Sequence, residues 1–487
     1  MSAFLVVSPA LVPLAFTLLT ALLHRRPKLA ANVSLFGGLA LLGTSLALMG
    51  KVLSEGVQRS SFGNWQAPFG IEFVVDPLSA SMALITAIMG VAALLFQRAA
   101  IDPAPEGPTL HPLIHGLLAG VGGAFVTGDL FNLYVWFEVM LLSSLGLLAL
   151  GMARRHVDAT LKYFVLNAIG TLLFLAGIAG VYGLTGHVNY DALSIAGLEV
   201  EPARLLPVVA LVCLAFLVKA GAFPVFAWLP ASYHTLPAPL LALFAALLTK
   251  VGVYAVLRML GDVFTMTPDI GYQVLGWVAV ATMVTGVLGA AFHWDMRRIL
   301  SFHIVSQIGY MLLGIALNSE AGTIGTVFYI LHHIIVKANL FLIAAIIFSM
   351  TGSYDLRRIG GLWKARPWLG LLFLVPALSL VGIPPLSGFW AKFIVVRESL
   401  TQGEMVWAAS ALLVGFLTLY SMMKIWMQAF WAKHPDADWT LPAPRPGMGW
   451  AWLVTIALAA ITVAIGLMPQ PLYTFAVEAA RVMGVTP

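Results

Sequence analysis

The chain has 487 residues, of which 60% are hydrophobic and only 10% are charged, and its mean hydropathy is +0.95. Because water-soluble proteins carry about 25% charged residues, this composition excludes a soluble globular fold and predicts an all-α polytopic membrane protein. The net charge of +5 is spread over the loops and does not indicate nucleic-acid binding, and the single cysteine excludes four-cysteine metal and iron–sulfur sites within the chain.

The first apolar run of the chain covers residues 2–23. It lacks the positive region that precedes the apolar core of a cleaved signal peptide, and its charges, Arg25, Arg26 and Lys28, follow the run instead. We therefore interpret this run as a retained first membrane span.

Apolar stretches long enough to cross a bilayer recur along the chain. A helix needs about 20 apolar residues to cross about 30 Å of hydrocarbon, and this criterion predicts about fourteen spans, two of them broken. The spans are 2–23, 31–53, 75–97, 111–128, 130–151, 160–184, 203–228 with a break, 238–260, 271–294, 299–317, 322–350, 367–400 with a break, 404–431 and 449–470. An interfacial helix or loop is predicted at 187–202, and a tail follows residue 471.

The lysines and arginines of the loops predict the orientation of the chain. One set of alternate loops carries fifteen of them and the other set carries six. The richer set is expected to face the cytoplasm, and it includes the loop after the first span. The N-terminus therefore lies outside, and an even number of spans places the C-terminus outside as well. The segment 51–74 then lies outside, where its aromatic and Gly/Pro pattern predicts a short hairpin. The sequence has no P-loop or dinucleotide fingerprint, which argues against an ATP-driven pump.

Five lysines remain inside the predicted spans once the lysines and arginines counted with the loops are set aside, and one acid joins them. They are Glu138, Lys219, Lys250, Lys337, Lys392 and Lys424. A charge at the bilayer centre costs at least about 2.5–3.5 kcal/mol, so we expect these groups to face the bundle interior, pair, bind water or lose their charge. Burial disfavours the ammonium form of lysine, and a lysine whose two forms are close in energy can take and release protons. We interpret Glu138 and the first four lysines as a proton relay, although Glu138 could also form a structural ion pair, and we expect Lys424 to extend to the cytoplasmic interface.

Histidines supply a second group of polar residues in the spans. His333 and Lys337 are four residues apart and share a helix face, while His332 points about 100° away. On the preceding span, His303 begins a polar stripe at helical spacing. Because histidine titrates near neutral pH, we interpret all three histidines as relay residues, with packed and hydrogen-bonded histidines as the alternative. Their spacings offer no carboxylate or thiolate set for a metal ion, so we expect neither a metal site nor a cofactor.

Two predicted spans carry a break beside a lysine. The break residues are Gly221 and Pro224 in the seventh span, and Pro384, Pro385 and Gly388 in the twelfth. Proline disrupts the preceding helical turn, and carbonyls freed inside a membrane need protein or water partners, which indicates a hydrated site at each break. Lys219 precedes its break and Lys392 follows its own. This reversed order and the odd separation of the spans favour an inverted repeat of the transporter type, with two unrelated proline kinks as the alternative.

Five motifs give the chain a family resemblance that covers almost its whole length. They are FNLYVWFEVMLLSS, VKAGAFPVFAWLP, SFHIVSQIGYMLLGIAL, LHHIIVKANLFL and PPLSGFWAKF. Together they resemble the antiporter-like membrane subunits shared by respiratory complex I and Mrp cation/proton antiporters. The resemblance implies fourteen helices with two inverted five-helix repeats, each containing a broken helix. The chain would divide into a three-helix segment at 1–110, a first repeat at 111–260, a second repeat at 261–431, and a last span with a tail at 432–487.

The resemblance also implies roles for the buried charges. Glu138 and Lys219 would form an interacting pair, Lys250 would be the connecting site, and Lys392 would be the terminal lysine. The lysine of the eleventh span and the nearby histidines would form a central hydrophilic axis. Position 254 departs from the pattern of some relatives, because it is Tyr254 where they carry histidine.

Three hypotheses for the function follow. The first is a proton-translocating subunit of a multisubunit Na⁺/H⁺ antiporter in the cell (inner) membrane, a secondary transporter and not an enzyme. Its partners would be other hydrophobic subunits of an Mrp-type complex, membrane lipid, protons and Na⁺, and not nucleic acid. The second is an antiporter-like proton-pumping subunit of complex I or of a membrane-bound hydrogenase, with no electron cofactor in this chain. The third is a self-sufficient carrier, which the resemblance disfavours because the family acts in multisubunit complexes.

Overall fold

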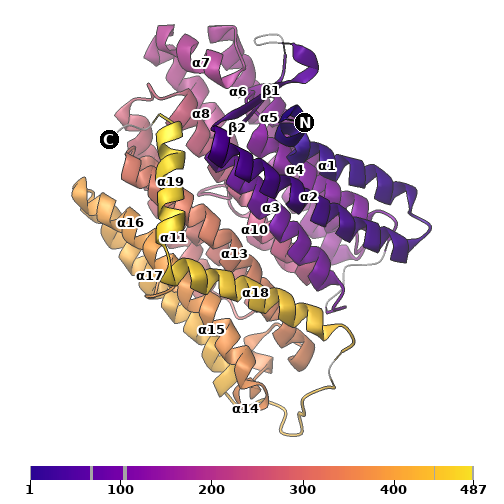
Figure 1. Cartoon of the computed structure of the whole chain (residues 1–487). Helices are drawn as coiled ribbons and strands as arrows, with labels where there is room; N and C mark the ends of the chain where they lie inside the picture. Colours follow the sequence, from indigo (N-terminus) through magenta and orange to yellow (C-terminus); the bar gives the residue numbers. More distant parts are fainter. Residues whose placement is uncertain (1, 66–69, 102–106, 444, 485–487) are drawn as a thin grey trace.

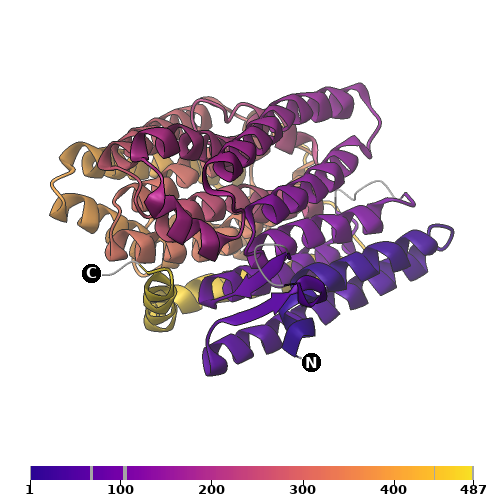
Figure 2. The ribbon, with the colours of Figure 1, turned by 90° about the horizontal axis from the view of Figure 1, so that it is seen from above.

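The computed structural model describes residues 2–65, 70–101, 107–443 and 445–484. The chain forms a bundle of long α-helices, shown from the side in Figure 1 and from above in Figure 2. The N-terminal helices and the orange helices of the C-terminal third lie at opposite sides of the bundle (Figure 2).

The long helices coincide with the fourteen predicted spans. They are α1 (Ser2–Leu22), α2 (Pro27–Glu55), α3 (Pro77–Gln97), α4 (Leu110–Val126), α5 (Leu130–Ala149), α6 (Arg154–Thr185), α8 (Pro202–Ala220), α10 (Ala238–Arg258), α11 (Asp269–Phe292), α12 (Met296–Ala316), α13 (Glu320–Thr351), α15 (Pro367–Val381) with α16 (Ser387–Thr401), α17 (Met405–Trp426) and α18 (Met448–Leu467). In the described residues, twelve helices are long and apolar enough to cross a membrane, and α4 and α15 are shorter apolar helices. The number of crossings stays a prediction.

Shorter elements lie between the long helices or, in the case of α19, after the last of them. They are α7 (Tyr190–Ala196), η2 (Gly197–Glu199), α9 (Trp228–Ser232), η3 (Tyr233–Thr235), η5 (Leu356–Arg358), α14 (Leu362–Ala365), α19 (Gln470–Val482), and the π-helical turns η4 (Met259–Val263) and η6 (Met427–Trp431). The predicted hairpin is confirmed by strands β1 (Gln58–Ser61) and β2 (Glu72–Val75), which pair antiparallel, with the turn η1 (Phe62–Asn64) after β1. Residues 66–69 of that predicted hairpin lie outside the described residues.

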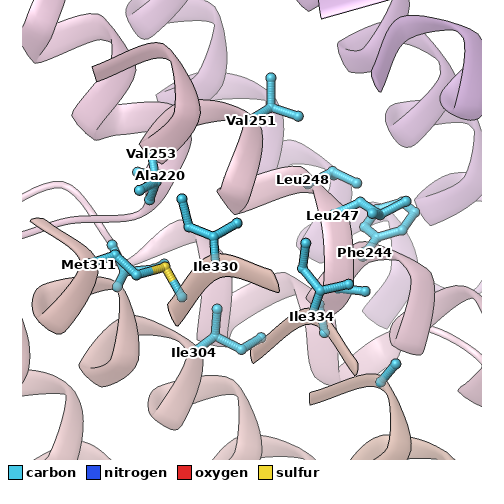
Figure 3. Close-up of a cluster of buried hydrophobic side chains, with 14 of the residues drawn as sticks. Ala220, Phe244, Leu247, Leu248, Val251, Val253, Ile304, Met311, Ile330 and Ile334 are labelled. Atoms are coloured by element: carbon cyan, nitrogen blue, oxygen red, sulfur yellow. The ribbon is translucent and has the colours of Figure 1, made fainter. Parts of the chain in front are cut away.

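Three helices form the centre of the bundle. Every residue of α10 is buried, and α12 and α13 are buried over almost their whole length. Figure 3 shows Ile330 and Ile334 of α13 between the apolar side chains of α10 and Ile304 and Met311 of α12. A helix that is apolar on all sides belongs in the core of a membrane bundle, whereas α1, α2 and α6 keep long exposed apolar faces for lipid.

Both broken helices end in the same glycine turn. Gly221 ends α8 with φ of 74°, and Gly382 ends α15 with φ of 97°. The following amides close the turn, since Ala222 N donates to Leu217 O at 3.0 Å and Ile383 N donates to Leu378 O at 3.1 Å. Glycine adopts this left-handed conformation without a steric penalty. The helices therefore end at a glycine, and the cis prolines Pro224 and Pro385 follow three residues later.

Two details of the predicted breaks need correction. Gly388 is not part of the break, because it lies in the first turn of α16, and Gly382, which the prediction omitted, ends α15 instead. The reversed order of lysine and break does not indicate inversion either, since an inverted repeat keeps the order of its residues along the chain. The shared Gly-x-x-Pro turn is the feature that two repeats would have in common, and Lys219 and Lys392 do not occupy equivalent positions beside it.

Contacts between loops sort them into two groups at opposite ends of the bundle. At the end that carries α7 and the hairpin in Figure 1, ion pairs join Arg59 to Asp191 and Asp76 to Arg258. At the end that carries α14, Asp295 pairs with Asp355 in a β-bridge, Gly361 N donates to Ala432 O, and Arg98 donates to Asn32. Each contact stays within one of the two loop sets defined by the lysine and arginine distribution.

Gly388 provides a test of the packing at the second break. A Cβ at this position would overlap the carbonyl oxygen of Ser379 and lie 3.1 Å from the His332 ring. Because overpacking costs about 1–3 kcal/mol, we expect Gly388→Ala to lower the thermal unfolding midpoint of the purified protein in detergent. Gly183→Ala on exposed α6 is the control, since its Cβ would meet no atom within 4 Å, and equal midpoints for the two variants would contradict the packing argument.

Candidate functional site

The predicted relay residues lie on six helices that pack around the centre of the bundle. Lys250, Lys337, His303 and His333 are fully buried, and His332 and Lys219 are at most 5% exposed. Glu138 on α5 and Lys392 on α16 are half-buried. The structure therefore places all eight residues away from a fully exposed surface, as the cost of a charge in lipid requires.

Glu138 and Lys219 lie at the α5 side of the site. The Oε1 atom of Glu138 and the Nζ atom of Lys219 are both buried, and neither has a hydrogen-bond partner in the described part of the chain. Lys219 Nζ instead lies 5.5 Å above the ring of Phe137. The two charges are close enough to interact electrostatically, but they form no direct ion pair within 4.0 Å among the described residues. Glu138 and Lys219 therefore interact electrostatically at a distance and form no direct ion pair.

Lys250 and Lys337 occupy the centre, on α10 and α13. Lys250 Nζ donates to the carbonyl oxygen of Ala245 at 2.6 Å, and Lys337 Nζ is buried without a partner in residues that the structure describes. The two ammonium groups interact electrostatically. Because like charges disfavour each other in a medium of low dielectric constant, the two lysines cannot carry protons independently of one another.

The three histidines lie between the central lysines and the second break. His332 Nδ1 is 3.3 Å from Ser387 Oγ, at the start of α16, and His303 Nε2 is 2.7 Å from Ser421 Oγ on α17. Both ring nitrogens of His333 are buried without a partner in the part of the chain that is described. His333 lies near enough to Lys250, Lys337, His332 and Lys392 for electrostatic interaction with each. His333 thus lies within electrostatic range of both the central lysines and Lys392.

Lys392 lies directly against the second helix break. Its Nζ donates to the carbonyl oxygen of Val381 at 2.9 Å, in the last turn of α15, and lies 4.6 Å above the Tyr310 ring. These residues line a cavity of about 620 Å³, together with the turn residue Gly382 and Gly415 of α17. The break therefore supplies an acceptor for the ammonium group in a space large enough for water. At the first break, Val218 O accepts instead from the indole Nε1 of Trp228 at 3.0 Å.

Two further lysines anchor helix ends. Lys424 Nζ donates to the carbonyl oxygens of Ala291 and His293 at 2.7 and 2.6 Å, where α11 ends. This geometry matches a lysine that extends to the interface and satisfies terminal carbonyls. Lys162 is exposed and paired with Asp158 at 2.6 Å.

Sequence reasoning missed a buried ion pair at the end of α10. Arg258, a loop residue in the predicted topology, is 5% exposed and lies 2.5 Å from the carboxylate of Asp76. A signal for this network was present in the sequence, because Tyr254, Arg258 and Asp262 recur at every fourth residue, where each side chain can reach the next one turn away. Among the described residues, no group of three or more histidine, cysteine or acidic side chains could hold a metal ion.

Comparison with known protein families gives a match over most of the chain. The family described as "NADH:quinone oxidoreductase/Mrp antiporter, TM" matches residues 127–421. The D-type subunit of the Na⁺/H⁺ antiporter of Alkalihalophilus pseudofirmus is 40% identical over 479 residues, which cover 98% of this chain and 96% of that protein. The Na⁺/H⁺ antiporter protein of the same type from Bacillus subtilis is 35% identical over 432 residues, covering 88% of each chain.

Solved structures show the same fold. A chain of the Mrp complex from a Dietzia species superposes with a TM-score of 0.92 at 32% identity, covering 99% of this chain and 97% of that one. A chain of an archaeal membrane-bound sulfane sulfur reductase superposes with a TM-score of 0.91 at 26% identity, with the same coverage. A chain of respiratory complex I from Thermus thermophilus reaches 0.83 at 24% identity, covering 98% and 100%, and shows the fold alone.

His234 offers a pH-dependent test of the loop that follows the first break. Its Nδ1 is 3.0 Å from Pro230 O, and burial together with the nearby Arg298 lowers the pKa of His234 to about 4. Because the folded state disfavours the protonated ring, the stability gained from neutral His234 is complete above about pH 6.5 and is lost as the pH falls toward 4. We expect the thermal midpoint to fall less over this range in His234→Gln than in the wild type, and parallel pH curves would contradict the assignment.

Proposed function

The chain belongs to the family of NADH:quinone oxidoreductase and Mrp antiporter membrane subunits, and we propose that it translocates protons within a multisubunit monovalent cation/proton antiporter. The observation that carries this proposal is the line of buried titratable groups from Lys250 to Lys392. Lys337 and both nitrogens of His333 lack partners in the described residues, although buried polar groups are normally hydrogen-bonded. Buried groups without fixed hydrogen-bond partners are suited to a proton path, because their partners can change as each proton is transferred.

The proposed path uses differences in charge between neighbouring groups. A proton that arrives at Lys250 raises the repulsion on Lys337, which favours transfer through the histidines toward Lys392. At Lys392 the ammonium group is stabilised by the carbonyl oxygen of Val381 and by the Tyr310 ring. Each group therefore holds a proton only while its neighbour is neutral, and water in the cavity beside Lys392 completes the path.

Glu138 and Lys219 are proposed to link proton position to cation movement. Because they attract one another without direct contact, a small change in the surrounding charge can alter their separation. A shift of one pKa unit in either group corresponds to about 1.4 kcal/mol, which is enough to change the balance between a close pair and a separated pair. Protonation of Lys250 or Lys392 would thereby reach the α5 side of the molecule.

The shared turn supports two repeats, which we place at 111–260 and 261–431, between an N-terminal segment at 1–110 and a C-terminal span and tail at 432–487. We propose that the protein lies in the cell (inner) membrane with both termini outside. The proposal rests on the lysine and arginine distribution and on loop contacts that stay within each predicted set. Other hydrophobic subunits, membrane lipid, protons and Na⁺ are the proposed partners, and the chain acts as a transporter subunit and not as an enzyme.

Alanine at either member of the pair tests the proposed coupling. We expect Glu138→Ala and Lys219→Ala to abolish sodium-linked proton movement in everted vesicles from cells that express the whole complex, because each change removes one of the two interacting charges. Lys162→Ala is the control, since this lysine is exposed and lies outside the path. Full exchange activity in either pair variant would contradict the coupling role.

Copurification in mild detergent separates the antiporter from a redox complex. The Na⁺/H⁺ antiporter relatives and the Mrp complex structure favour the antiporter, so we expect small hydrophobic subunits to copurify with the chain and not redox subunits. Recovery of iron–sulfur or flavin subunits at a constant ratio to the chain would favour the respiratory alternative. The similarity to a chain of the sulfane sulfur reductase is the observation that supports this alternative.

A further inference from the structure

A groove lies at the end of the bundle that carries α14 in Figure 1, where α13 ends and where α15 and α18 begin. The three helices pack against one another, and the space between their ends measures about 360 Å³. The helix residues that line it are Ser349, Met350, Trp368, Leu369, Met448 and Trp452. The groove therefore lies where the apolar bundle meets its loops.

Two arginines line this groove from separate loops. Arg366 directly precedes α15, and Arg445 lies in the loop before α18. Both are exposed, and neither side chain has an ion pair or a hydrogen bond with a described residue. None of the described residues that line the groove is acidic. Because like charges repel one another, two arginines that share a groove without a counter-charge from the chain favour an anion between them.

Tryptophans lie beside the two arginines. Trp368 follows Arg366 by two residues and is 76% exposed, and Trp450, in the first turn of α18, is 41% exposed. Trp452, one of the residues lining the groove, is half-buried. Tryptophan is enriched where membrane proteins meet the lipid headgroups, because its ring is apolar and its N–H is polar. The surroundings of the groove therefore match the boundary between hydrocarbon and headgroups.

We propose that this groove binds the headgroup of an anionic phospholipid in the cytoplasmic leaflet. Arg366 and Arg445 donate to the phosphate oxygens, since the planar guanidinium matches the geometry of phosphate. The glycerol and the first methylene groups of an acyl chain pack against Trp368, Trp452 and Leu369. Both arginines belong to the loop set that we place in the cytoplasm, and the cytoplasmic leaflet carries the anionic lipids.

A lipid in this groove would connect three helix ends. The groove is lined by the last residues of α13, which carries Lys337, and by the first residues of α15, which ends at the second break. A ligand that binds only the folded arrangement stabilises it. The bound phospholipid would therefore hold α13, α15 and α18 together at the end where their loops leave the membrane. It takes no part in the proposed proton path.

Replacement of both arginines by glutamine, Arg366→Gln with Arg445→Gln, is the decisive variant. The whole complex is purified in mild detergent, phosphatidylglycerol or phosphatidylcholine is added, and native mass spectrometry measures the lipid that stays with this chain. We expect wild type to bind phosphatidylglycerol more tightly than phosphatidylcholine. The double variant should need about 25-fold more phosphatidylglycerol for half-saturation, because each arginine contributes a factor of about five.

Two further variants serve as controls. Arg155→Gln removes an exposed arginine at the start of α6, in the same loop set, that does not line the groove, and its half-saturating concentration should stay within two-fold of the wild type. Arg366→Lys with Arg445→Lys keeps both charges and loses the planar donors. We expect a loss of affinity for this variant that is smaller than the loss for the glutamine variant.

Four outcomes would overturn the proposal. Equal affinity of the wild type for the two lipids is the first, and an unchanged affinity of the glutamine variant for phosphatidylglycerol is the second. Inorganic phosphate that displaces phosphatidylglycerol at equal concentration would show a site for small anions and not for lipid. Loss of a copurifying subunit from the glutamine variant, with lipid binding unchanged, would show a subunit interface. Because the readout is bound lipid, the result is independent of sodium-linked proton movement and hence of the proposed function.

Discussion

The cost of an unpaired charge in a medium of low dielectric constant governs this structure. The central helices α10, α12 and α13 are apolar enough to be buried on all sides, yet they carry two lysines and three histidines. Replacing such groups with apolar side chains is often neutral or stabilising, so stability does not explain why they are there. Their burial without complete hydrogen bonding supports the proposed role in proton transfer.

Two kinds of buried charge follow from this constraint. Arg258 and Asp76 are paired at 2.5 Å and further hydrogen-bonded, so their charges are permanent and fixed in place. Lys219 and Lys337 have no hydrogen-bond partner in the described residues, and lysine can lose its proton when buried, whereas arginine does not. The residue type therefore separates the charges that are fixed in ion pairs from those that deprotonation can remove.

The sequence predicted the helices better than it predicted their contacts. Apolar length is a local property, so the long helices agree with the predicted spans to within a few residues. The position of Arg258 could not be read in this way, because its burial depends on α3, which places Asp76 beside it from far away in the chain. In the twelfth span the prediction likewise named the prolines and omitted Gly382, although this left-handed glycine is the residue that ends α15. The spacing of four residues on α10 was the usable signal that was overlooked.

The two breaks share a backbone turn but differ in the side chain that donates to a nearby carbonyl oxygen, Val218 O three residues before Gly221 and Val381 O directly before Gly382. At the first break the acceptor, Val218 O, is held by the indole of Trp228, which does not titrate. At the second break Val381 O is held by the Lys392 ammonium, and loss of a proton from Lys392 would weaken that bond. Of these two carbonyl oxygens, only Val381 O is bound by a group that can lose a proton, whereas Lys219 Nζ has no hydrogen-bond partner among the described residues. The proposed proton path would therefore meet a titratable donor beside Gly382 and an indole donor near Gly221.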